Sequence, residues 1–215
     1  MLVPQVEPPF PLAWGFSTRF DPAAELPPVR LSQVHGCGIV EAFGAVQEGD
    51  GLWTMNPGER IGVRVADCVP ILLAGWVSGH RPWVAALHAG WRGAVAGILR
   101  RGIEGFQGLG GIPEDLTWAL GPAIQKCHFD VGPEVIVAAR LDPACSDDLV
   151  EVYPDGNPHF DLSGFLNAQA KGMGLDPRKD GSIALCTMCQ TELLWSYRRG
   201  DTSDRQWGWI GILPH

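Results

Sequence analysis

The stretch RIGVRVADCVPILLAGWVSGHRPWVAALHAGWRG, residues 60–93, decides the fold. Apolar and β-branched residues dominate 60–74 and 82–88, which predicts buried strands with a bend at the polar, proline-containing segment 67–70. After Gly90 the period changes, and apolar residues recur at helical spacing from Arg92 to Phe106. A strand, a glycine-containing turn and a helix are therefore expected in succession.

Further strands are predicted at 38–43, 116–120, 183–186 and 207–213, and helices at 133–141 and from an Asp161 N-cap to about Met173. Strands and helices are mixed without strict alternation. This pattern predicts an α+β fold, a layered α/β sandwich with mixed sheets, in a single compact domain covering 1–215. Residues 1–13 are expected to form an irregular N-terminal segment because of Pro8, Pro9 and Pro11.

Composition excludes several classes of protein. The chain has 215 residues, 46% hydrophobic and 19% charged, and a formal net charge of −8. The negative charge argues against a general nucleic-acid binder, which needs a basic stripe. Neither a membrane-spanning run nor a signal peptide is apparent, so we expect no membrane partner and a cytoplasmic location, with the six cysteines as reduced thiols.

Three residues are the candidate metal ligands. His35, Cys68 and His88 each stand at the edge of an apolar run, where a strand gives way to a loop. Catalytic zinc takes three such ligands and leaves one position open. Two other interpretations remain: packed side chains, or a Cys68 thiolate with His88 as its base and Asp67 or Gln33 as its orienting group. Sequence alone does not separate metal ligation from nucleophilic catalysis, since both need a thiolate.

Arginines provide candidate anion sites. Arg92 follows the turn at Gly90 and begins the predicted helix, where free N–H groups also attract anions. Arg198, in an adjacent arginine pair, and Arg19 are further candidates. A solvated surface arginine is the competing interpretation for each of them.

The remaining cysteines give weaker signals. Cys186 and Cys189 form a C-x-x-C, but no second pair lies at zinc-ribbon spacing. We expect Cys186 to be a small buried apolar residue on a strand, and Cys127 to pack in the core. Whether Cys127, beside His128, reaches the pocket stays open at this point.

Several motifs together point to a family. They are Q-V-H-G at 33–36, A-D-C-V-P at 66–70, H-A-G-W-R-G at 88–93, G-P-A-I at 121–124, D-L at 161–162 with Asn167 and Gln169, C-T at 186–187, S-Y-R-R at 196–199, and Arg205. In this order they resemble the YfiH-type laccase-domain family, also called the polyphenol oxidase or purine nucleoside phosphorylase family. The resemblance runs from about Trp14 to the C-terminus.

This resemblance implies a fold similar to Cys–His toxin deamidases and a zinc ion held by His35, Cys68 and His88. It also implies phosphorolysis of adenosine, inosine, guanosine and methylthioadenosine to the base and the sugar 1-phosphate, with deamination of adenosine. Purine nucleosides and phosphate would be the partners. One departure is the short, proline-rich segment 20–31, which lacks the family's glycine-rich and Asn-Leu-Gly residues.

The leading hypothesis is a zinc-dependent purine nucleoside phosphorylase with adenosine deaminase side activity. Cys68, His88, Asp67 and Arg92 are its predicted catalytic residues. Its predicted substrate- and phosphate-binding residues are Arg92, Gln33, Arg19 and Arg198. Three alternatives stand beside it: a Cys68–His88 thiol hydrolase or amidase acting on a cell-wall precursor, a copper-dependent polyphenol oxidase, and a non-catalytic metal-binding module. Six histidines without an H-x-H pair do not suit a four-copper relay, although copper is possible at the same ligands.

Overall fold

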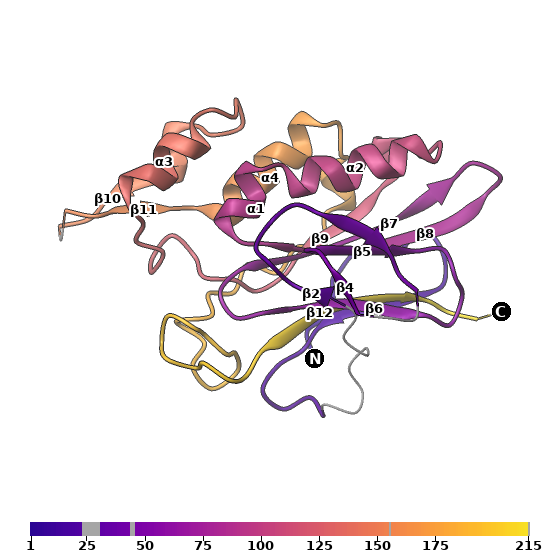
Figure 1. Cartoon of the computed structure of the whole chain (residues 1–215), viewed down its shortest axis with the longest axis horizontal. Helices are drawn as coiled ribbons and strands as arrows, with labels where there is room; N and C mark the ends of the chain where they lie inside the picture. Colours follow the sequence, from indigo (N-terminus) through magenta and orange to yellow (C-terminus); the bar gives the residue numbers. More distant parts are fainter. Residues whose placement is uncertain (23–30, 44–45, 155, 215) are drawn as a thin grey trace.

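The computed structural model describes residues 1–22, 31–43, 46–154 and 156–214. Three layers stack on one another (Figure 1). The central layer is a mixed five-stranded sheet in the order β3-β5-β8-β7-β9, comprising Ile39–Glu41, Gly51–Thr54, Arg81–Ala89, Val69–Val77 and Thr117–Leu120. One of its faces packs on an antiparallel sheet in the order β1-β12-β6, comprising Leu12–Phe16, Gln206–Ile212 and Arg60–Val65.

Helices cover the other face of the central sheet (Figure 1). They are α1, α2 and α4, at Trp91–Val95, Ile98–Gly108 and Leu162–Gly172, and a further helix, α3 at Pro133–Ala139, packs against α1. Two small pairs complete the described elements: β2 with β4 (Leu31–Ser32 and Gln47–Glu48), and β10 with β11 (Val150–Val152 and Pro158–Phe160). Short 3-10 helices lie at Pro113–Asp115, Asp147–Leu149 and Pro177–Lys179. The expected α+β layered sandwich in one compact domain is confirmed.

The hairpin β7–β8 explains why its sequence is apolar throughout. Ile71 and Leu73 face the helices, whereas Leu72 and Ala74 face the second sheet. Because successive side chains point to opposite faces, a strand buried on both sides needs apolar residues at every position. Each fully buried leucine or isoleucine contributes about 1.5–3 kcal/mol of transfer free energy. The hairpin register places Pro70 opposite His88.

The helix predicted from Arg92 to Phe106 is two helices. Gly97 adopts φ +83°, in the left-handed region, and separates α1 from α2. Glycine enters this region without the steric penalty of a Cβ atom, so the chain turns here and starts a second helix. Of the expected apolar stripe, Ile98, Leu99, Ile103 and Phe106 are fully buried, and Val95 is half-buried.

Other expectations are largely confirmed. The strands predicted at 116–120 and 207–213 are β9 and β12, and the helix predicted at 133–141 is α3. Asp161 caps α4 by accepting a hydrogen bond from the Gly164 N–H. The described N-terminal segment has no helix or strand before β1, which begins at Leu12. The strand expected at 183–186 is wrong, because this stretch forms only an isolated bridge at Cys186.

The shortened segment 20–31 falls mostly on residues 23–30, outside the described residues. Among the helices that the structure describes, none has the length and apolar character needed to cross a bilayer.

Candidate active site

Three side chains from separate parts of the chain converge above the central sheet. His35 follows β2, Cys68 lies in the turn between β6 and β7, and His88 stands near the end of β8. Their ligand atoms all lie within 4.8 Å of one another. The two imidazole rings meet edge to face, with centroids 4.8 Å apart. The cluster predicted from three distant motifs is therefore assembled in the fold.

Glycines make this convergence possible. A Cβ atom at Gly90 would lie 3.1 Å from the Cys68 Sγ, and one at Gly93 would lie 2.6 Å from the Gly36 carbonyl oxygen. The H-A-G-W-R-G turn can therefore pack against the loop that carries His35 only without side chains at these two positions. His35 itself has φ +60°, a rare conformation for a residue other than glycine. Such backbone is typical of functional sites.

Asp50 is the buried partner that sequence analysis missed. Its Oδ1 lies 2.8 Å from the His88 Nδ1 and accepts a hydrogen bond from the His35 N–H. Its Oδ2 accepts a bond from the Gly36 N–H at 2.7 Å. A carboxylate on Nδ1 fixes the tautomer and leaves Nε2 for a ligand. Glycines on both sides of Asp50, just before an apolar run, were the available signal.

Electrostatics in the metal-free site favour a thiolate beside an imidazolium. Burial disfavours the Cys68 thiolate, but hydrogen bonds from His35 and His88 outweigh burial and lower the pKa of Cys68 to about 7. Burial likewise opposes the His88 cation, yet the bonds to Asp50 and Cys68 raise the pKa of His88 to about 9. Burial opposes ionisation of Asp50 as well, and the His88 bond still holds its pKa below the usual value.

Asp67 is held in place rather than presented to the cleft as a free carboxylate. It is buried, has φ +86°, and accepts bonds from the Thr187 hydroxyl at 2.6 Å and the Arg198 N–H at 2.7 Å. Its two oxygens thus join the loop 181–200 to the residue preceding Cys68. This geometry favours a positioning role for Asp67.

A cleft of about 750 Å³, lined by both polar and apolar side chains, opens beside the three converging side chains. Its arginines are Arg64, Arg198 and Arg205. Arg198 pairs with Asp130, and Arg205 binds the carbonyl oxygens of residues 201, 202 and 204. The guanidinium of Arg64 lies over the Trp207 ring, 6.0 Å from its centroid. Among the described residues it makes no hydrogen bond or ion pair, so it can meet an anion in the cleft. No motif in the sequence marks Arg64 as a site residue.

The other predicted substrate-binding residues are placed differently. Arg92 is exposed, stacks on Trp91 at 4.3 Å, and lines a smaller, mostly apolar pocket of about 80 Å³ that His35 and Cys68 also border. Gln33 lines the cleft, but its amide is bound to the Arg64 backbone N–H and carbonyl. Arg19 pairs with Asp201, stacks on Trp195, and is absent from the described lining of either pocket.

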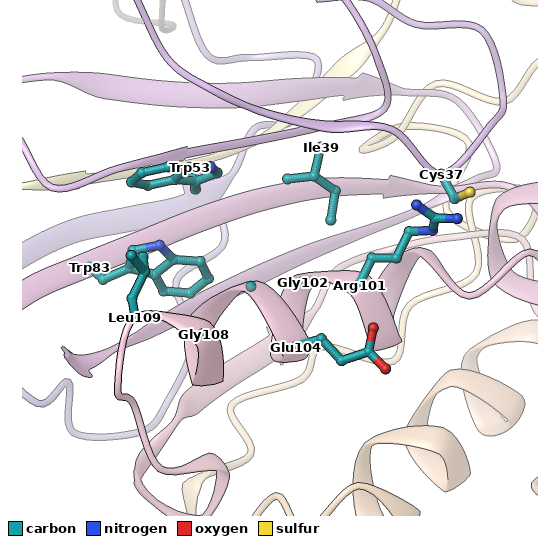
Figure 2. Close-up of a pocket in the computed structure, with 10 residues that line it drawn as sticks. Cys37, Ile39, Trp53, Trp83, Arg101, Gly102, Glu104, Gly108 and Leu109 are labelled. Carbon is teal, nitrogen blue, oxygen red and sulfur yellow. The ribbon is translucent and has the colours of Figure 1, made fainter. Parts of the chain in front are cut away.

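A separate pocket of about 390 Å³ lies between α2 and the strands β3, β5 and β8. Figure 2 shows Trp53 and Trp83 at one end of it and the side chain of Arg101 extended toward Cys37 at the other. Of the two Cys/His groups found among the described residues, neither lies in this pocket. It is therefore a poorer candidate for the chemistry than the cleft and the small pocket that Cys68 borders.

The residues at the cleft fit a metal ion. Two imidazoles and one thiolate form a borderline-soft donor set suited to zinc, and copper takes similar ligands. The bond from Asp50 to His88 supplies the orientation that a metal-bound histidine needs.

Cys127 does not enter this cleft. It lies near His128, Cys186 and Cys189, and ligand atoms from all four residues lie within 4.8 Å of one another. The expectation that Cys127 packs in the core is wrong, because its side chain is exposed. Cys186 is buried as expected, but within this group rather than on a strand.

Comparison with known proteins agrees with this architecture. A family model described as multi-copper polyphenol oxidoreductase laccase matches residues 18–213. The chain belongs to this family. The resemblance to YfiH-type laccase-domain proteins is thereby confirmed, and solved family members share the fold. A Bacillus licheniformis hypothetical protein YfiH superposes with a TM-score of 0.77 at 25% identity, covering 86% of this chain and 73% of the other.

Named relatives of this laccase-domain chain include two kinds of enzyme. A purine nucleoside phosphorylase from Deinococcus radiodurans is 37% identical over 85% of this chain and 69% of its own length. The Escherichia coli purine nucleoside phosphorylase YfiH is 32% identical over 91% and 79%. An adenosine deaminase, RL5, from an unknown prokaryotic organism is 33% identical over 75% and 61%.

Proposed function

We propose that this protein is a zinc-dependent purine nucleoside phosphorylase with adenosine deaminase side activity. The observation that carries the proposal is the His35, Cys68 and His88 group at the edge of a cleft that also holds arginines. The names of its relatives support the same activities.

The cleft offers the surfaces that a nucleoside and phosphate need. Phe129, Tyr197 and Ile124 provide apolar area for a purine ring, and Arg64 and Arg198 provide positive charge for phosphate. In phosphorolysis a phosphate oxygen bonds to C1′ of the sugar while the C1′–N9 bond breaks and its electron pair leaves with the base. We assign phosphate binding to Arg64 and Arg198 because both border the cleft, whereas Arg92 lies in the smaller pocket.

His35, Cys68 and His88 would hold the metal ion. Zinc with three protein ligands supplies a Lewis acid that polarises oxygen and lowers the pKa of a water molecule it binds to about 7. Asp50 keeps the proton of His88 on Nδ1, and Asp67 fixes the backbone beside Cys68 through Thr187 and Arg198. This chain's residues thus orient the ligands and the reactants.

The test is incubation of the zinc-loaded protein with adenosine and phosphate, followed by chromatography of the products. We expect adenine and ribose 1-phosphate, together with a smaller amount of inosine. Cys68→Ala should lose both activities, whereas Cys37→Ala, which changes a thiol in the separate pocket, should keep them. Full activity in Cys68→Ala would refute the site assignment, and absence of product from the unmodified protein would refute the function.

One observation favours a second candidate, a thiol hydrolase or amidase. Metal-free Cys68 has its pKa near 7 and neighbours two imidazoles, as a nucleophilic cysteine requires. Stringent chelation distinguishes the candidates: a thiol enzyme keeps its activity without metal and loses it on alkylation, and a metal-dependent phosphorylase loses its activity on chelation.

A further inference from the structure

A second group of metal-ligating side chains lies outside the cleft. Cys127 and His128 come from the loop after β9, and Cys186 and Cys189 come from the loop 181–200. The sulfur of Cys127 lies 3.8 Å from that of Cys186 and 3.9 Å from that of Cys189. The His128 Nδ1 lies 3.2, 3.7 and 3.5 Å from the sulfurs of Cys127, Cys186 and Cys189.

These separations match the edges of a zinc tetrahedron. Zinc bonds of about 2.3 Å to sulfur and about 2.0 Å to nitrogen imply S···S distances of about 3.8 Å and N···S distances of about 3.5 Å. Three cysteines and one histidine make a closed four-ligand set, which is typical of structural zinc sites. We propose that Cys127, His128, Cys186 and Cys189 bind a second, structural zinc ion.

The backbone around Cys186 supports this assignment. The backbone N–H groups of Gln125, Met188 and Cys189 donate hydrogen bonds to its sulfur. The N–H groups of Met188 and Cys189, two and three residues after Cys186, stabilise a thiolate at the first cysteine of the C-x-x-C turn. The bond from Gln125 adds a donor from the loop that carries Cys127 and His128.

Simple packing and a disulfide explain the group less well. Cys127 and Cys189 are exposed, so burial of apolar surface does not account for three sulfurs in contact. A disulfide would join only two of the three thiols and would leave the third beside His128. A divalent ion would contact all three sulfurs and the His128 nitrogen at once, and would pair the thiolates with positive charge.

The site would tie together two loops that form one wall of the cleft. Ala123 and Cys186 already form an isolated parallel bridge, with the Thr187 N–H donating to the Ala123 carbonyl. Thr187 lies between the two C-x-x-C ligands and donates to Asp67, which precedes Cys68. The zinc ion would thus fix Thr187 and, through Asp67, the backbone at the first metal site.

The inference does not depend on the proposed enzymatic function, and metal stoichiometry tests it. The full chain is purified with zinc, dialysed against metal-free buffer, and measured by native mass spectrometry. We expect two zinc ions per chain in the unmodified protein. One should remain in Cys68→Ala, which keeps the second group intact, and one in Cys189→Ser. Cys145→Ser, whose thiol lies outside both groups, should keep two.

Cobalt substitution identifies the ligands. In Cys68→Ala, cobalt should give the intense sulfur-to-metal charge-transfer bands of a tetrahedral thiolate site, and His128→Cys should retain binding with a fourth sulfur. If Cys189→Ser fails to fold, free thiols are counted instead in Cys68→Ala, before and after chelation of the metal. Chelation should make the thiols of Cys127, Cys186 and Cys189 reactive. A disulfide among these three residues, or no bound metal in folded Cys68→Ala, would overturn the proposal.

Discussion

Replacement of Asp50 by asparagine should weaken zinc binding without unfolding the protein. The Asp50 carboxylate accepts three hydrogen bonds, from the His88 ring and from the His35 and Gly36 backbone. Asparagine has the same shape but only one acceptor oxygen. If that oxygen faces His88, the amide NH₂ meets the Gly36 N–H donor. If it faces Gly36, the NH₂ meets His88 and favours the tautomer whose proton sits on Nε2, where the metal should bind.

Either arrangement removes the charge that orients His88, so we expect zinc affinity to fall about 10–100-fold. This change corresponds to about 1.4–2.8 kcal/mol. Competition titrations with a fluorescent zinc chelator measure it directly, in the Cys189→Ser background so that only the first site is observed. Asp147→Asn is the matched control, since that carboxylate is 95% exposed and pairs with Arg140 at the surface.

In the same metal-free protein, NMR titration should show the pKa of His88 below about 9, because the cation has lost its anionic partner. Zinc affinity within twofold of the parent, in a folded Asp50→Asn protein, would refute the role assigned to Asp50.

Three further outcomes are expected. Alkylation of Cys68 in the metal-free protein, followed by peptide mapping, should rise to half its maximum near pH 7 rather than near 9. Cys68→Ala should lower the pKa of His88, since the neighbouring thiolate stabilises the imidazolium; an NMR pKa unchanged at about 9 would contradict this. Gly93→Ala should destabilise the protein by about 1–3 kcal/mol in urea unfolding, because its Cβ meets the Gly36 carbonyl at 2.6 Å. Gly105→Ala on the open face of α2 should instead stabilise by roughly 0.5–1 kcal/mol, and equal effects at both glycines would refute the close contact.

The parts of the fold that local pattern determines were predictable from the sequence. Strands β7 and β8 are buried on both faces, so their composition alone identifies them. The helical periodicity after Gly90 correctly located the apolar stripe. The break at Gly97 was missed, because a glycine inside a periodic pattern does not reveal that its φ is positive. At 183–186 the apolar run resembles a strand. Its backbone makes only scattered bonds, such as the Ile183 N–H to the Leu120 carbonyl.

Residues of the candidate site were predictable only where the residue type alone, histidine or cysteine, indicates a metal ligand. His35, Cys68 and His88 were found for this reason. Asp50 was not found, because this carboxylate becomes a partner of His88 only when β5 pairs with β8 in the central sheet. The four-residue group at Cys127 joins positions 59 residues apart, at spacings unlike a zinc ribbon. Long-range pairing of this kind does not appear in local sequence.

The β7–β8 hairpin also has a consequence for the order of folding. It carries His88 on one strand and Cys68 directly before the other, so two ligands of the first metal site are brought together by a single local element. Hairpins form within about 1–10 μs, far faster than sheets built from distant segments. His35 and Asp50 arrive through longer loop closures. The hairpin therefore presents two of the three ligands early, and a zinc ion captured there would guide the later arrival of His35.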